Sequence, residues 1–129
     1  MLDLSVNSLY YPLLVSVLMV ILDIPYLMSI GPKWMSMIYK IQGGQRRTKP
    51  FIVVISSIIV YLLMGYAMTR FVVRSKGTIL DAAILGGCFY GVFDFTNMVL
   101  FADYRWEMAV IDMIWGAGMF AMVAKLLGL

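Results

Sequence analysis

The sequence predicts an all-α polytopic membrane protein, a bundle of four antiparallel transmembrane helices. Of its 129 residues, 63% are hydrophobic and only 13% are charged, whereas a soluble domain carries about 25% charged residues. A chain this small could not bury so much apolar surface in water. Four apolar runs also approach or exceed the length of about 20 residues that crosses a bilayer. Because lipid admits only helices or closed barrels, runs of this length predict helices.

The four predicted spans fill most of the chain. They cover residues of about 9–30, 51–72, 79–101 and 108–127. RSKG joins the second span to the third, and ADYRWE joins the third to the fourth. Short connections make neighbouring helices antiparallel and adjacent. We therefore expect residues 1–129 to form a single membrane domain.

The connection between the first two spans is longer and basic. In KWMSMIYKIQGG, apolar side chains recur at helical spacing with cations elsewhere on the wheel. This pattern predicts a short interfacial helix over about 33–42, with an irregular basic loop as the alternative. Its charge suits anionic lipid better than nucleic acid and weakly favours the cytoplasmic side. The residues expected at lipid headgroups are Lys33, Trp34, Lys40, Arg46, Arg47 and Lys49.

Polar residues interrupt the third span, where residues 93–97 read FDFTN. Asp94 lies about 10 Å inside the end of that span at 1.5 Å per residue, and Asp112 lies about 9 Å inside the start of the fourth. Both ends share one connection, so the two carboxylates are expected at one depth. Asp23 lies about 10 Å inside the end of the first span, which faces the same side. Three helices are thus predicted to bring three carboxylates into one layer.

Further polar side chains are predicted to join these carboxylates inside the bundle. Tyr90, Asp94 and Asn97 are spaced i, i+4, i+7, which places them on one helical face. Gly87 and Gly91 lie beside that face and would let a neighbouring helix approach. The whole predicted cluster comprises Asp23, Tyr90, Asp94, Thr96, Asn97, Asp112 and Trp115.

The buried acids need neutralising, because an ionised Asp in mid-membrane costs at least about 3 kcal/mol. Protonation of one clustered carboxyl, bound water, or an inward-reaching Arg46, Arg47 or Arg105 could each do so. The chain contains no histidine and shows no metal-ligand spacing or phosphate-binding loop. We therefore expect no metal and no cofactor.

Three functions remain open for such a layer. The first is structural: a small membrane protein that packs against partners, with the acids bonded between helices. The second is transport of protons or cations along the carboxylates. The third, an intramembrane acid–base enzyme, lacks any motif that signals access for substrate, so we expect no enzymatic activity and name no catalytic residue.

Three features together resemble a known family: Asp23 late in the first span, Phe93–Asn97 in the third, and DMIWG, residues 112–116, in the fourth. They are similar to the domain-of-unknown-function family 2177, small membrane proteins of bacteria and large DNA viruses. KIQGG, residues 40–44, looks more like the virus-encoded members. The resemblance implies the four-span fold and no established activity. It also implies a multi-pass component of an internal virion membrane, with lipid, other membrane or capsid-type proteins, or a second copy as partners.

Overall fold

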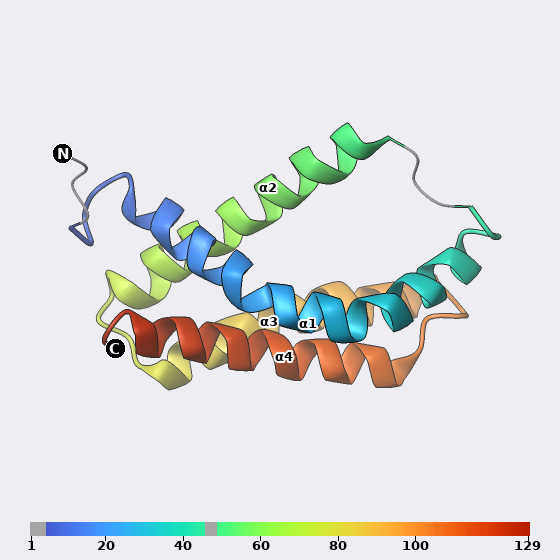
Figure 1. Cartoon of the computed structure of the whole chain (residues 1–129). Coiled ribbons are helices and arrows are strands. Elements are labelled where there is room, and N and C mark those ends of the chain that lie inside the picture. The colour runs from blue at the N-terminus through green and yellow to red at the C-terminus, as the bar shows by residue number, and fades with distance from the viewer. Residues whose placement is uncertain (1–4, 46–48) are drawn as a thin grey trace.

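The chain folds into four long helices in a computed structural model that describes residues 5–45 and 49–129. In chain order they are α1 (Tyr11–Ile41), α2 (Pro50–Met68), which continues as the π-helical turn η1 (Thr69–Val73), α3 (Ile79–Leu100) and α4 (Trp106–Leu126) (Figure 1). All four spans are long and apolar enough to cross a membrane. No strand occurs within the described ranges. The predicted all-α, four-span fold is confirmed.

The first helix is longer than a membrane span requires. Its 31 residues extend about 46 Å, against a hydrocarbon core of about 30 Å. Pro25 and Pro32 lie inside it, and α1 bends along its length (Figure 1). Each proline removes only one bond from the backbone ladder, so the helix bends without ending. The separate interfacial helix predicted over 33–42 is therefore not confirmed, because most of this segment is the last part of α1.

Among the described residues, the most extensive helix–helix packing joins α3 to α4. A Cβ atom added at Gly86 would lie 2.2 Å from the carbonyl oxygen of Gly116, and one at Gly116 would lie 2.9 Å from the Gly86 oxygen. Two helices approach this closely only where neither carries a side chain. The glycine that makes this contact is Gly86. Its neighbour Gly87, singled out by the sequence, has room for a methyl group 3.6 Å from Ala117 Cβ.

Two apolar cores lie toward opposite ends of the bundle. The larger one surrounds Met19, Met68 and Phe120, whose side chains are fully buried, near the α3 start and the α4 end. The smaller one gathers Met37 and Met108 near the α3–α4 connection. Asp23 of α1 and Asp112 of α4 lie between these cores along their helices. The interior is thus layered: apolar, polar, apolar.

The second helix stands partly away from the others. Its C-terminal half packs on α1, where a Cβ atom at Gly65 would lie 2.1 Å from Ser16 Oγ. In residues 51–60, nine side chains are exposed and one is half-buried, so no face of this stretch is covered. Figure 1 shows this half of α2 diverging from the other three helices. The bundle is therefore open along the first half of α2, where the exposed side chains are mostly apolar.

Candidate functional site

Three carboxylates from three helices are buried between the two apolar cores. Asp23 on α1 is 5% exposed, Asp94 on α3 is fully buried and Asp112 on α4 is 9% exposed. Each lies on the inward face of its helix. We call them, with their hydrogen-bond donors described next, the carboxylate layer.

The carboxylate of Asp23 accepts two hydrogen bonds. The Tyr61 hydroxyl of α2 donates to Oδ2, and the indole Nε1 of Trp115 in α4 donates to Oδ1 at 2.7 Å. Both oxygens are therefore paired with donors from other helices. This one residue ties α1 to α2 and to α4.

The carboxylate of Asp112 is bonded back to α1. The Tyr26 hydroxyl donates to its Oδ1 at 2.6 Å. The Tyr26 ring also stacks on Trp115, with ring centroids 4.6 Å apart and planes 3° from parallel. Because Trp115 donates to Asp23, the stacked pair fixes the donors of two carboxylates together.

The carboxylate of Asp94 is only half satisfied. Tyr104, from the α3–α4 connection, donates its hydroxyl to Oδ1. The other oxygen, Oδ2, is buried and has no hydrogen-bond partner within the described part of the chain. The carboxyl of Asp112 lies close enough to interact with it electrostatically. Two ionised carboxylates this close repel each other, and a single proton held between them would satisfy the unpaired oxygen.

Tyr104 was not predicted as a donor from the sequence. In the structure its side chain is buried, with 5% exposed. Burial, followed by its hydrogen bond to Asp94, raises the pKa of Tyr104 above the ordinary value. The hydroxyl therefore keeps its proton and stays a donor. Tyr26 was also missed, yet it lies three residues after Asp23, a spacing that places both on one face of α1.

Of the predicted cluster, Thr96 lies away from the carboxylate layer, while Tyr90 and Asn97 lie beside it. Thr96 is exposed on the outer face of α3. Tyr90 packs against Gly116 and lies near Asp23 and Tyr61, and no hydrogen bond joins it to Asp94 in the described part of the chain. Asn97 lies near Tyr104. The donor beside Asp94 is Tyr104, which reaches back from the α3–α4 connection, rather than a neighbour on α3.

No arginine neutralises the layer in the described part of the chain. Arg105 turns outward and pairs with Glu107 at 3.6 Å, with its side chain 63% exposed. Arg46 and Arg47 lie outside the described residues. Hydroxyl and indole donors take the role proposed for these cations. Such donors can stabilise carboxylates by hydrogen bonding. No group of three Asp, Glu, Cys or His in the described ranges could hold a metal ion.

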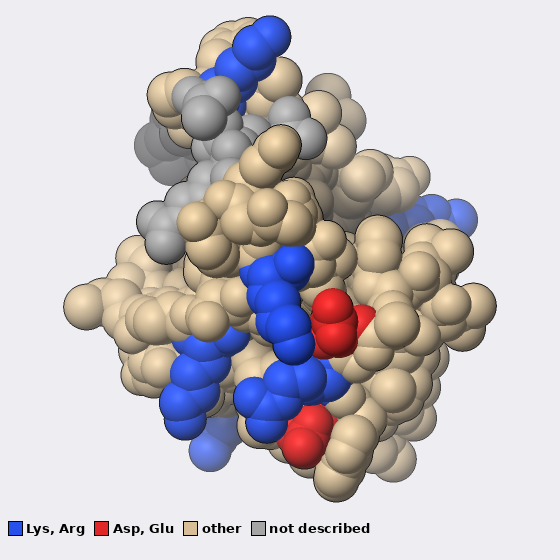
Figure 2. Space-filling model, turned by 90° about the vertical axis from the view of Figure 1, so that its right-hand side faces the viewer, with Lys and Arg blue, Asp and Glu red and all other residues tan. Residues whose placement is uncertain are grey.

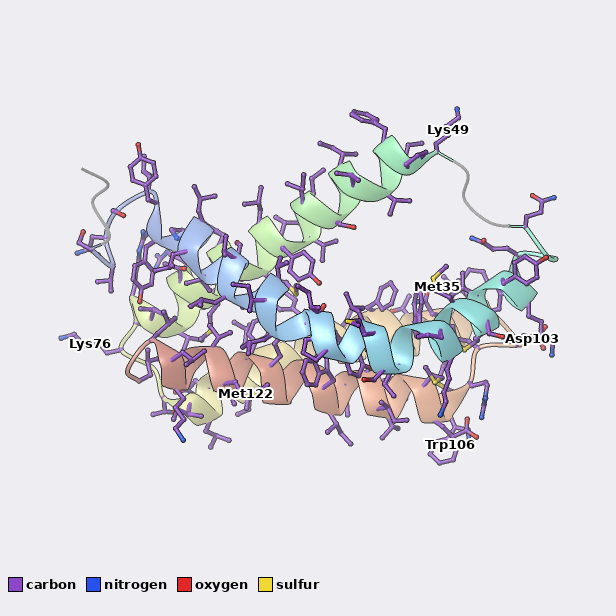
Figure 3. The ribbon with its side chains drawn as sticks, viewed as in Figure 1. Met35, Lys49, Lys76, Asp103, Trp106 and Met122 are labelled. Carbon is purple, nitrogen blue, oxygen red and sulfur yellow. The ribbon has the colours of Figure 1, made fainter. Side chains whose placement is uncertain are left out.

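The residues predicted to contact lipid headgroups lie in two separate places. Lys33 and Lys40 line one cavity near the end of α1, and Trp34 packs into the smaller apolar core beside it. Lys49 stands apart from Asp103 of the α3–α4 connection, because it precedes the diverging half of α2 (Figure 3). The basic connection therefore does not act as one patch within the described residues.

Four apolar helices around a buried polar layer define a polytopic integral membrane protein. The chain belongs to the DUF2177 family, described as predicted membrane proteins, whose model matches residues 8–129. This match confirms the resemblance drawn from the three sequence motifs. Neither curated proteins nor solved structures give a match to the chain.

Proposed function

We propose that this protein is a structural, partner-binding component of a membrane, with no enzymatic activity. One observation carries the proposal: each carboxylate of the layer accepts a hydrogen bond from a residue of another element. Asp23 bonds to α2 and α4, Asp112 bonds to α1, and Asp94 bonds to the α3–α4 connection. The layer therefore fastens α1 to α2 and α4, and α3 to the connection that leads into α4, as hydrogen bonds of about 0.6–2 kcal/mol each can do.

A finer form of the proposal places the protein in an internal virion membrane, linking lipid to a protein shell. The KIQGG segment supports this placement through its resemblance to virus-encoded members. The uncovered half of α2 supports a partner within the membrane, either another membrane protein or a second copy. The cations near the end of α1 support contact with lipid or with an acidic capsid-type surface.

Proton or cation transport is the second candidate, and the unpaired Oδ2 of Asp94 favours it. Transport needs a polar route to both faces of the membrane. On the far side of the layer, the larger apolar core fills the interior with the fully buried Met19, Met68 and Phe120. This barrier argues for the structural role over conduction through one copy.

An Asp23→Asn variant tests the proposal, with Asp94→Asn as its matched control. Asp23 uses both oxygens as acceptors, so an amide would set an NH₂ group against a donor and lower the free energy of unfolding by about 1–3 kcal/mol. Asp94 has a spare oxygen facing Asp112, where the amide of Asn can donate, so this variant should keep its stability. The measurement is unfolding of purified protein in detergent.

Proton flux into liposomes is measured in parallel. The structural proposal expects the wild-type protein and both variants to match protein-free liposomes. A wild-type proton flux that Asp94→Asn abolishes, with stability intact, would establish transport instead.

A further inference from the structure

A cavity of about 450 Å³ lies where α1 ends, beside the α3–α4 connection. Its polar lining includes Lys33, Ser36 and Lys40 from α1, with Asp103 and Arg105 from the connection. Its size falls in the range of about 300–1,000 Å³ that small-molecule sites occupy. Figure 2 looks onto this end of the molecule and shows Lys and Arg side chains gathered beside Asp and Glu side chains.

The position of the cavity along α1 places it at the membrane surface. About 20 residues from the start of α1 cross the hydrocarbon core, which brings the chain to Ile30. Lys33 therefore lies in the headgroup layer, with Lys40 about two helical turns further out. Trp106, 60% exposed, lies at the same end as Asp103 (Figure 3), and tryptophan is enriched at this depth.

The cations of the cavity are available to an anion. Lys40 pairs with Asp103 at 3.6 Å, but the two side chains are 74% and 56% exposed. Arg105 pairs with Glu107 in a similarly exposed contact. Exposed ion pairs contribute little and exchange partners readily. Lys33 forms no ion pair in the described part of the chain, and its charge is in excess.

We propose that this cavity binds the phosphate group of an anionic phospholipid. Lys33 and Arg105 contact the phosphate oxygens, Lys40 joins them when it leaves Asp103, and the Ser36 hydroxyl bonds to the headgroup. A lipid phosphate fits better than a soluble one, because the cavity opens in the layer where lipid phosphates are concentrated. This lipid site goes beyond the proposed structural role, and it does not depend on the carboxylate layer.

The test uses the full chain in mixed micelles that contain equal amounts of phosphatidylglycerol and phosphatidylcholine. Native mass spectrometry counts the lipids that remain bound. The wild-type protein should retain phosphatidylglycerol preferentially. Each of Lys33→Gln and Arg105→Gln should weaken this binding about fivefold, the effect expected of one basic residue at an anionic surface.

Two further variants separate a specific site from general attraction. Lys125→Gln removes an exposed cation at the opposite end of α4, and it should leave phosphatidylglycerol binding unchanged. Asp103→Asn removes the carboxylate that repels a phosphate and frees Lys40, so it should strengthen the binding. An unfolding measurement on each variant confirms that these exposed changes leave the fold intact.

Three results would overturn the proposal. The first is equal retention of the two lipids by the wild-type protein. The second is the same loss in Lys125→Gln as in Lys33→Gln, which would indicate unspecific charge. The third is displacement of phosphatidylglycerol by low-millimolar inorganic phosphate, which would assign the cavity to a soluble anion. None of these results bears on the stability test of Asp23→Asn.

Discussion

At the scale of single residues, each of the three buried carboxylates accepts a hydrogen bond from a tyrosine hydroxyl: Asp23 from Tyr61, Asp112 from Tyr26 and Asp94 from Tyr104. An Asp in an apolar run must turn inward, so Asp23, Asp94 and Asp112 stand out in the sequence. Trp115 shares a face with Asp112 and was also predictable. Tyr104 lies in a connection, where periodicity says nothing about direction.

The Tyr61 hydroxyl is predicted to stabilise the fold through Asp23. Tyr61→Phe removes one of the two donors to a buried carboxylate and should lower the free energy of unfolding by about 1–3 kcal/mol. Tyr66→Phe is the matched control, because Tyr66 is 53% exposed on the same helix. Unfolding in detergent measures both. Equal stability of the two variants would argue against a bond between Tyr61 and Asp23.

At the scale of elements, the spans followed from length and composition, while their ends and packing did not. The third and fourth spans were placed within two residues of α3 and α4. The continuation of α1 through Pro32 was missed, because a proline in the sequence does not say whether a helix bends or stops. The divergence of α2 was also missed, since apolar residues cover all its faces and give no direction for packing.

The glycines of α3 and α4 differ sharply in what they tolerate. Gly86→Ala should destabilise the α3–α4 pair, because its methyl group would meet the Gly116 backbone at 2.2 Å. A Cβ atom at Gly118 would meet no neighbouring atom within 4 Å. Gly118→Ala should therefore leave the free energy of unfolding unchanged or raise it by about 0.5–1 kcal/mol, because alanine is the better helix former. Thermal unfolding of the two variants measures the difference. Equal effects would contradict the close contact between the two helices.

At the scale of the whole molecule, the sequence predicted that polar residues from separate helices share one depth. It could not show the apolar cores on both sides, because burial depends on how the helices are turned. The larger core separates the carboxylate layer from one end of the bundle. The smaller core and the basic cavity lie at the other end. Because one end of the interior is closed by apolar side chains, we favour a carboxylate layer that holds the helices together over one that conducts ions.

The most direct test of this account is a double-mutant cycle between Asp23→Asn and Tyr61→Phe, measured by unfolding in detergent. If the layer joins α1 to α2 through this pair, the double variant should lose less stability than the sum of the single variants, by about 1 kcal/mol. The control cycle, Asp23→Asn with Tyr66→Phe, should be additive within about 0.5 kcal/mol. Additive losses in both cycles would contradict the claim that the carboxylate layer holds the helices together.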